Sequence, residues 1–464
     1  MKKMTNLHNH KYITAICLLF LAFLHFSCKK FVDVGAPLSE VESSKVFAND
    51  QATLSAALGV YANMGLSNLY IYSGGATLYP GLSADELTYT SSNTELLSFQ
   101  HNAIIANNGT GIYSRLWVPA YSNIYNANAI LEGLISSSGL SDTLKSQIKG
   151  EMLVVRSLNY FYLINLFGDV PLELTTNYQV NSTMARTPTD KIYTQLIADL
   201  KTASLLLNSN YPSSVNTRPN KWTAMALLAR IYLYQKDWTD AVATSSAVIN
   251  SSQYNLESNL GNVFLEGSAE TIWQLANDYH NTGEASAFVP YSSSSTPSYT
   301  INSYLLSAFE PGDQRMINWL GKNTVNGVTY YYPYKYQNRS YSPITEFEVM
   351  FRLAEQYLIR AEAEAQLGDL NSAAADLNII RNRAGLPNTT AAAQSTLLTA
   401  IASERQVELF CEWGHRWLDL KRTGQANAVL GLEKAPYWNP TVILYPIPLS
   451  ELQLNPNLVQ NPGY

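Results

Sequence analysis

The fold is decided by residues 348–383, which read EVMFRLAEQYLIRAEAEAQLGDLNSAAADLNIIRNR. Apolar and small residues recur there at intervals of three and four, which predicts two amphipathic helices, Glu348–Leu367 and Leu370–Arg383. The Gly368-Asp369 step can join them, since glycine ends helices and aspartate caps the next one. Thr345 lies three residues before Glu348, which is the spacing of a capping box, so we expect the first helix to begin there.

An earlier stretch repeats this pattern, with predicted helices over Trp222–Tyr234 and Trp238–Ile249. When the two stretches are aligned, Ala229 falls on Ala361, Asp237 on Asp369, Trp238 on Leu370 and Ala241 on Ala373. Small residues where helices cross, separated by a two-residue turn, are typical of tetratricopeptide-like repeats. Each pair hides one apolar face against its neighbour, so stacked pairs make a continuous core.

Helical periodicity continues along much of the remaining chain. The further predicted helices run from Asn49 or Asp50 to about Tyr61, from Trp117 to Leu134, from Ser141 to Phe167, over Thr189–Leu207 and over Leu397–Cys411. Residues 65–115 show only weak periodicity, and the Pro-rich residues Asn439–Tyr464 close the chain. The sequence therefore predicts a mainly α-helical protein with two clear helix-pair repeats and two degenerate ones, near residues 117–167 and 189–207.

The N-terminus has the pattern of an export signal. Three lysines (Lys2, Lys3 and Lys11) precede an apolar stretch, residues 13–26, that is too short to span a bilayer as a helix. Ser27-Cys28 follows, which resembles the cleavage site of a bacterial lipoprotein, although His25 stands where leucine is usual. We expect residues 1–27 to be removed and Cys28 to carry lipid. The alternative is an ordinary signal peptide with an incidental cysteine.

Charge and cysteine content exclude several classes of protein. The 464-residue chain has a net charge of -6 and no basic run, so nucleic acid is not an expected partner. Of the three cysteines, Cys17 lies in the leader and Cys28 is the predicted lipid site, which leaves Cys411 without a partner for a disulfide. We expect Cys411 to be a buried, inert thiol in a helix over Glu404–Trp413.

Tyrosines concentrate in residues 278–341, which have little helical periodicity and are expected to be largely loop. Flat amphipathic rings on loops suit sugars, because a ring stacks on the C–H face of a pyranose while a phenol oxygen bonds its hydroxyls. The alternative is that several of these rings simply cover the core. From this stretch and residues 70–99 we select Tyr72, Tyr89, Asn93, Tyr291, Trp319 and Tyr331 as candidate ligand-binding residues.

Catalytic and metal-binding patterns are weak. Glu404, Glu408 and Glu412 fall on one face of a predicted helix, as a glycosidase pair could. Their spacing beside Arg405 and Arg416, with Arg381 and Arg383 nearby, fits a structural ion-pair stripe better. Glu412 and His415 lack the partners of a metal site. We expect no catalytic residue, no metal and no cofactor.

A series of motifs runs through the chain in a recognisable order. They are Cys28 with Lys30-Phe31-Val32-Asp33-Val34, Tyr125-Asn126-Ala127-Asn128, Arg156–Phe161 leading to Phe167–Leu172, Tyr357–Ala363, Asn382–Gly385, Glu404–Leu409, Arg416–Arg422, Tyr445–Pro448 and Gln460–Tyr464. With these motifs the sequence resembles the SusD/RagB family of Bacteroidetes outer-membrane nutrient-binding lipoproteins over essentially its whole length.

The resemblance implies one α-rich domain over residues 28–464. About four tetratricopeptide-like helix pairs would form a right-handed scaffold for an irregular ligand-binding region. Its parts would be an N-terminal helical part (about 28–250), a loop-rich aromatic segment (about 251–345) and a C-terminal helix pair with the closing segment (about 346–464).

The family also implies a function and a partner. The partner would be a SusC-like TonB-dependent transporter, which imports the glycan that the lipoprotein captures at the outer membrane. The lipoprotein would face the cell exterior, and the alternative is that it faces the periplasm. The membrane would be contacted through the lipid anchor only. Two alternatives are an adaptor or peptide-binding lipoprotein of the same transporter system and an enzyme.

Overall fold

The computed structural model describes residues 43–65, 69–106, 109–277 and 280–464. Residues Phe47–Tyr464 form one compact unit. In the preceding unit, Met1–Val46, the described part is the short helix α2 (Ser43–Val46). The predicted leader and Cys28 lie outside the described residues. No helix among the described residues is long and apolar enough to cross a membrane.

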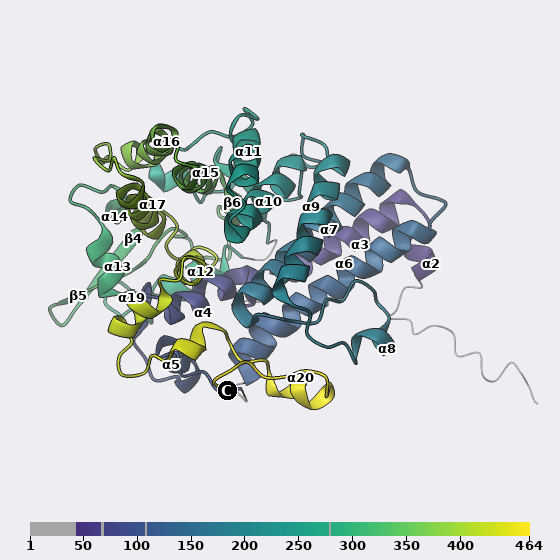
Figure 1. The fold of residues 1–464 in the computed structure, drawn as a ribbon, viewed down its shortest axis with the longest axis horizontal. Coiled ribbons are helices and arrows are strands. Elements are labelled where there is room, and N and C mark those ends of the chain that lie inside the picture. The colour runs from purple at the N-terminus through teal and green to yellow at the C-terminus, as the bar shows by residue number, and fades with distance from the viewer. Residues whose placement is uncertain (1–42, 66–68, 107–108, 278–279) are drawn as a thin grey trace, which may run out of the picture. The chain divides into compact units, whose positions relative to one another are not determined.

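A stack of antiparallel helices forms the scaffold (Figure 1). Its members are α3 (Asp50–Gly65), α6 (Val118–Ser136), α7 (Asp142–Phe167), α9 (Thr189–Leu206), α10 (Lys221–Gln235), α11 (Trp238–Ile249), α15 (Leu353–Leu367), α16 (Leu370–Arg383) and α17 (Gln394–Glu408). From α6 onwards each helix of the series packs against the next, and α17 packs on α15 and α16. Neighbouring helices thereby bury each other's apolar faces in a continuous core, which is the tetratricopeptide-like arrangement that the repeats predicted.

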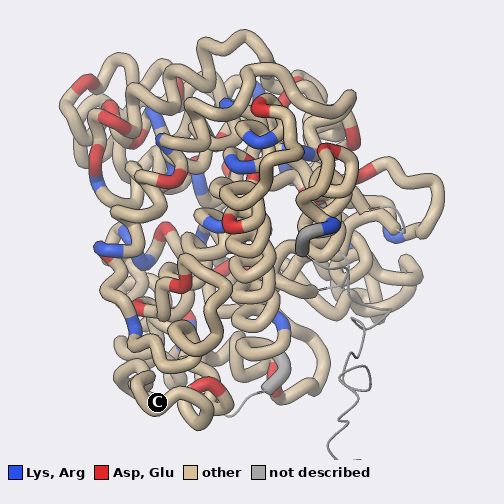
Figure 2. Tube along the Cα trace, turned by 90° about the vertical axis from the view of Figure 1, so that its right-hand side faces the viewer, with Lys and Arg blue, Asp and Glu red and all other residues tan. Residues whose placement is uncertain are grey.

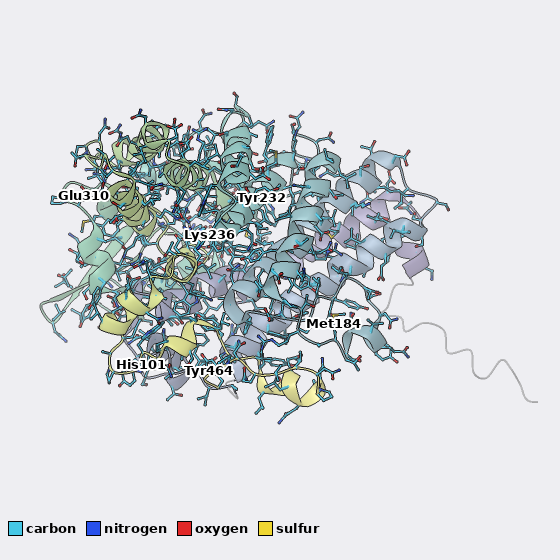
Figure 3. The ribbon with its side chains drawn as sticks, in the orientation of Figure 1. His101, Met184, Tyr232, Lys236, Glu310 and Tyr464 are labelled. Carbon is cyan, nitrogen blue, oxygen red and sulfur yellow. The ribbon has the colours of Figure 1, made fainter. Side chains whose placement is uncertain are left out.

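The two clear repeats share the details of their turns. Asp237 and Asp369 cap α11 and α16, and each carboxylate accepts a bond from the backbone N–H three residues on, at 3.2 Å in both cases. The residues before them, Lys236 and Gly368, both adopt the left-handed conformation that ends the preceding helix (Figure 3 labels Lys236). The aligned alanines of both pairs are fully buried, so the predicted small-residue contacts between helices are confirmed.

One predicted helix start is wrong. Residues Glu348–Arg352 form strand β6, which pairs antiparallel with β2 (Thr271–Leu275), and α15 begins only at Leu353. There is also no capping box, because the Thr345 N–H donates to Asn281 Oδ1 at 2.8 Å and Glu348 Oε1 accepts from Gly283 N at 2.8 Å. Both faces of β6 are buried, so the strand shows no alternation of polar and apolar residues that would have revealed it.

The last scaffold helix is shifted by three residues from its prediction. It spans Gln394–Glu408, and Cys411 and Trp413 lie beyond it with positive φ angles of 48° and 51°. Cys411 is therefore not helical. It is buried, as expected, and burial raises the pKa of its thiol.

Short elements and long connections form the remainder of the unit. The helices are α4 (Ala76–Ser83), α5 (Thr94–Gln100), α8 (Tyr178–Asn181), α12 (Gly283–Phe288), α13 (Ser303–Ala308), α14 (Arg315–Asn318), α18 (His415–Arg422), α19 (Ala426–Glu433) and α20 (Leu449–Leu454). The strands are β1 (Leu87–Tyr89), β3 (Tyr299–Ile301), β4 (Leu320–Val325) and β5 (Val328–Pro333), which pair as β1–β3 and β4–β5. These elements carry the candidate ligand residues.

Candidate functional site

A loop between α12 and β3, residues Val289–Ser298, links the two small sheets, and we call it the serine loop. At one end the Thr90 backbone N–H donates to Ser298 O at 3.0 Å and its hydroxyl donates to Pro297 O at 2.6 Å. Farther along, Asn323 Nδ2 of β4 donates to the backbone oxygens of Ser292 and Ser295, at 2.9 and 2.8 Å. The loop is therefore held in place although it has no regular structure of its own.

Tyr291 projects from the serine loop and is 91% exposed. The Arg339 guanidinium lies over its ring, with the guanidinium carbon 3.4 Å from the ring centroid, and the same side chain donates to Val289 O. Tyr341, two residues farther on, is 76% exposed and meets the His280 ring edge-on at 6.4 Å. These two loops thus present open aromatic rings beside a cation.

The predicted residues of the first loop region lie close to the same structure. Tyr89 is half-buried on β1 and faces Tyr299 of β3, with ring centroids 5.4 Å apart. Asn93 is exposed, but its side-chain oxygen caps α5 by accepting from Glu95 N and Leu96 N at 3.0 and 3.1 Å. Its amide nitrogen remains the group that could meet a ligand.

Tyr331 belongs to the β4–β5 hairpin and is half-buried. Its cross-strand neighbour is the exposed Lys322, so both side chains lie on one face of the hairpin. Asn323, which binds the serine loop, lies on the opposite face. The structure therefore places Tyr89, Asn93, Tyr291 and Tyr331 on segments joined through this loop, but Tyr331 does not share a face with the loop.

Burial removes Tyr72 and Trp319 from the candidate ligand residues. Tyr72 is fully buried, and its ring meets Tyr162 and Trp413 at centroid distances of 6.2 and 6.1 Å. Trp319 is 1% exposed, and its indole N–H donates to Leu260 O at 2.9 Å. Neither ring has a face open to a sugar, so both belong to the core.

Two arginines that stack on tyrosine rings near these loops were not predicted as site residues from the sequence. Arg339 stacks on Tyr291, and Arg115 lies over the half-buried Tyr70 ring, with its guanidinium carbon 5.5 Å from the centroid. Arg115 also interacts electrostatically with Glu95 and Tyr299. Neither arginine belongs to a motif, and only the folded chain brings each one onto a ring.

The three glutamates of the predicted stripe are buried in an ion-pair network. Glu404 pairs with Arg315 at 2.6 Å and with Arg381 at 3.2 Å. Glu408 pairs with Arg315, Arg352 and Arg383, and Glu412 pairs with Arg352 and Lys335. The structural interpretation is confirmed, as are the roles of Arg381 and Arg383.

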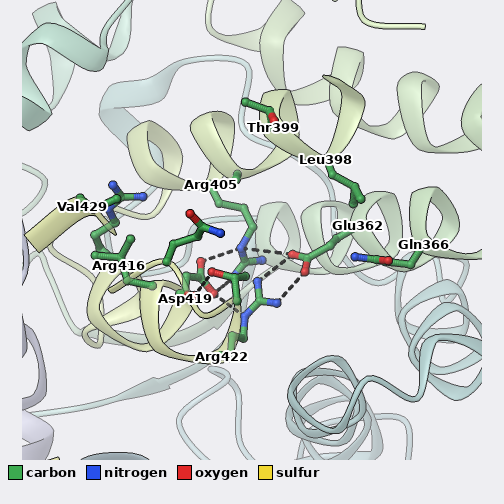
Figure 4. Close-up of a pocket in the computed structure, with 13 residues that line it drawn as sticks. Glu362, Gln366, Leu398, Thr399, Arg405, Arg416, Asp419, Arg422 and Val429 are labelled. Carbon is green, nitrogen blue, oxygen red and sulfur yellow. Dashed lines mark hydrogen bonds and ion pairs between the residues drawn. The ribbon is translucent and has the colours of Figure 1, made fainter. Parts of the chain in front are cut away.

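Two expected partners of that stripe bind elsewhere. Arg416 pairs with Asp85 at 2.6 Å, and Arg405 pairs with Asp419 at 2.7 Å. Arg405 and Asp419 line a cavity of about 430 Å³ between α15, α17 and α18 (Figure 4). Arg422 forms ion pairs with both Asp419 and Glu362 there, at 2.7 and 2.6 Å. The charged groups of this cavity are therefore paired with one another. Figure 2 likewise shows acidic and basic residues interspersed along the trace.

A second cavity, of about 600 Å³, lies at α6, α8 and α20 and has a different character. Tyr125, Tyr178 and Leu454 line it and are largely exposed, and Glu173 and Glu451 add two carboxylates. Burial raises the pKa of Glu173 to about 7, and the neighbouring Glu451 adds to the shift. This apolar, acidic cavity is a candidate contact for a protein rather than a sugar, because its rim includes aliphatic side chains.

The histidine that the sequence sets three residues after Glu412 lies in the core. His415 is buried, its Nε2 lies 3.9 Å from Glu355, and burial lowers the pKa of the imidazole. In the described part of the chain, His, Cys, Asp and Glu side chains form no group of three or more that could hold a metal ion. The described residues thus form a helical scaffold that carries exposed aromatic side chains on its loops.

Comparisons with known proteins identify the family. A model described as SusD family matches residues 319–464, and one described as starch-binding associating with outer membrane matches residues 39–233. The chain belongs to the SusD/RagB family.

Individual relatives agree along the chain. A SusD-like protein, P25, of Formosa agariphila is 26% identical over 97% of this chain and 99% of its own length. The starch-binding protein SusD of Bacteroides thetaiotaomicron is 36% identical, over 25% of this chain and 21% of its own length. The solved structure of a laminarin-binding SusD-like protein superposes with a TM-score of 0.78 at 25% identity, covering 90% of this chain and 100% of that one.

Proposed function

We propose that this protein is a glycan-binding lipoprotein of the outer membrane. It is anchored through lipid on Cys28, faces the cell exterior, captures oligo- or polysaccharide without covalent chemistry, and delivers it to a SusC-like TonB-dependent transporter. Family membership, the outer-membrane association in the matching family description and the starch- and laminarin-binding relatives support this proposal.

The observation that carries the proposal is the exposed aromatic surface on the serine loop and its neighbours. Tyr291 is almost fully exposed on a loop that is nevertheless fixed by four hydrogen bonds from Thr90 and Asn323. A fixed ring loses little conformational entropy when a sugar stacks on it, whereas a flexible one loses more. Tyr89, Asn93 and Tyr331 lie on the segments that hold the loop and are proposed to extend the surface.

The proposed capture does not need high affinity. A single stacking site with a millimolar dissociation constant gains only about 4 kcal/mol. Anchoring beside a transporter raises the effective ligand concentration at the pore, so weak and reversible binding suits delivery. Hydrolysis forms no part of the proposal, because Glu404, Glu408 and Glu412 are occupied by arginine and lysine.

Affinity electrophoresis of the chain without its predicted leader tests this function. The panel contains starch, laminarin, pectin and host glycans, with a reducing-end assay on the same mixtures. We expect retardation by one class of polysaccharide, no new reducing ends, and loss of retardation in Tyr291→Ser. The matched control is Tyr178→Ser, an equally simple loss of an exposed tyrosine, which should retain binding. Retardation by none of the polymers, or release of reducing ends, would contradict the proposal.

A second candidate function, an adaptor or peptide-binding lipoprotein of the same transporter system, is favoured by the apolar cavity at α6, α8 and α20. Its exposed Tyr178 and Leu454 resemble the anchors of protein interfaces more than a sugar site. If this surface contacts the transporter, Tyr178→Ser with Leu454→Ser should weaken co-purification with it while glycan retention persists. Tyr291→Ser should do the reverse, and loss of both properties in either variant would contradict two separate surfaces.

A further inference from the structure

Arg339 differs from the arginines of the buried ion-pair network in the groups that its guanidinium contacts. Buried arginines such as Arg230, Arg315 and Arg352 each pair with a carboxylate at 2.6 to 2.8 Å. Arg339 forms no ion pair with any described residue. Its guanidinium donates to the Val289 carbonyl and stacks on the exposed Tyr291 ring. Most of its five N–H groups therefore remain for a ligand.

Arg339 lies in a part of the sequence with few acidic residues. The chain has a net charge of -6, yet neither residues 285–309 nor residues 314–345 contain Asp or Glu. Two of the cations in the second segment, Arg315 and Lys335, are buried and paired with Asp313 and Glu412. The charges that these segments leave at the surface are those of Arg339 and Lys322, both positive. Glu346, just beyond the second segment, is buried and already accepts from the backbone N–H groups of Gln337 and Asn338, at 2.7 and 3.0 Å.

We propose that the captured glycan is anionic, and that Arg339 binds its carboxylate or sulfate group beside Tyr291. This inference rests on the proposed function and names its substrate class. A guanidinium presents donors as a planar fork that matches the paired oxygens of a carboxylate or sulfate. Stacking on Tyr291 and the bond to Val289 hold the fork in position before the ligand arrives, which reduces the entropy lost on binding.

The neighbouring rings complete such a site. Tyr341 follows Arg339 by two residues and is also open to solvent, so a sugar ring can stack there while its acidic substituent bonds the guanidinium. In the competing explanation, Arg339 only ties its own segment to Val289. That role predicts a loss of stability on substitution but no effect on which sugars bind.

Isothermal titration with matched oligosaccharides separates these possibilities. One pair is oligogalacturonate and its methyl ester, in which a methyl group neutralises each carboxylate, and the other is sulfated and unsulfated dextran oligosaccharide. The proteins are the wild type, Arg339→Gln, Arg339→Lys and the control Lys149→Gln, which removes an exposed positive charge from α7. Unfolding midpoints are measured alongside.

We expect the wild type to bind the charged member of at least one pair about ten-fold more tightly than the neutral one, the effect of one charge-assisted hydrogen bond. Arg339→Gln should lose this preference with an unchanged midpoint, Arg339→Lys should keep part of it, and Lys149→Gln should keep all of it. Higher salt should reduce the preference. Whichever pair shows the preference identifies uronate or sulfate as the group bound.

The failures of this inference and of glycan capture are distinguishable. Equal binding of charged and neutral sugars overturns the anionic substrate class and leaves glycan capture standing. A preference that survives in Arg339→Gln, or is lost equally in Lys149→Gln, overturns the role of Arg339. Binding of no saccharide in either pair or in the wider panel overturns the inference together with the proposed function.

Discussion

Replacing Glu408 by glutamine should destabilise the protein strongly, because this carboxylate is the centre of the buried ion-pair network. It is fully buried and accepts from Arg315 Nη1 at 3.0 Å, Arg352 Nη1 at 2.7 Å and Arg383 Nη2. Burial alone would raise the pKa of Glu408, but Arg383, Arg352 and Arg315 lower it well below its usual range. The three arginines therefore favour the ionised form of this carboxylate in the folded protein.

The magnitude follows from what Glu408→Gln leaves behind. Three guanidinium groups would face a neutral amide whose NH2 group cannot accept their bonds, and breaking a buried ion pair in this way costs about 3–5 kcal/mol. For a unit of about 420 residues the unfolding entropy is roughly 0.9 kcal/mol/K, so the midpoint should fall by about 3–6 °C.

Urea denaturation and calorimetry of Glu408→Gln measure this cost. The control is Glu266→Gln, the same chemical change at an exposed position, which should stay within about 0.5 kcal/mol of the wild type. A loss of less than about 1 kcal/mol in Glu408→Gln, the size expected of a surface pair, would refute the idea that these charges hold the unit together.

Two further outcomes follow from burial. Trp319→Ala should lower the unfolding free energy measured in urea melts by about 3–5 kcal/mol, because it opens a cavity in the core. Tyr291→Ala should lower it by less than about 0.5 kcal/mol, because that ring is exposed. Equal effects would contradict the assignment of one ring to the core and the other to the surface. Burial raises the pKa of Glu86 to about 8, so its protonated form is favoured by folding, and the stability it contributes is present at low pH and lost as pH rises toward 8. Glu86→Gln mimics the protonated form and cannot ionise. Between pH 5 and 8 the unfolding free energy of the wild type should therefore fall by about 4 kcal/mol more than that of Glu86→Gln. Parallel pH profiles of the two proteins in urea melts would contradict this.

The scaffold was predictable because its signals are local. The α7 helix has the predicted end at Phe167, with Ser141 as its cap, and the caps Asp237 and Asp369 occupy matching positions in the two repeats. Each of these features depends on residues within three or four positions of one another. A 3.6-residue period and a short polar side chain at its start therefore sufficed.

The prediction failed where pairing between distant segments decided the backbone. Glu348–Arg352 continues the apolar pattern of α15, and only its pairing with Thr271–Leu275 makes it a strand. At the other end of the scaffold, Leu409–Gly414 could extend α17 by composition, but Cys411 N donates to Glu86 Oε1 and Trp413 N to Thr77 Oγ1 instead. In both places bonds to remote residues replaced the local helical ones, which periodicity does not register.

The candidate ligand residues were predictable as a region and not as individuals. Tyr72 and Tyr291 each directly precede a serine in a stretch without sustained helical periodicity, yet one is fully buried and the other almost fully exposed. Trp319 looked like a loop residue, but its segment folds back over Phe264 and Phe410. Composition records how many rings a loop carries, whereas their exposure depends on which distant residues cover them.

The way the exposed loops are attached explains how one scaffold can serve different ligands. Thr90, Asn323 and Arg339 hold the serine loop through its backbone oxygens, and Asn281 holds the Arg339–Pro343 segment through Ser340 O and Pro343 O. None of these bonds requires a particular side chain at the accepting residue, because every residue has a carbonyl oxygen. Substitutions at the loop tips can therefore change the rings and charges offered to a ligand without releasing the loops.

The buried network of Arg315, Arg352 and Glu408 joins α14, β6 and α17 in the same unit and, unlike the loop tips, depends on every side chain in it. Relatives with different ligands should accordingly vary at positions such as Tyr291 and keep the equivalents of Glu408.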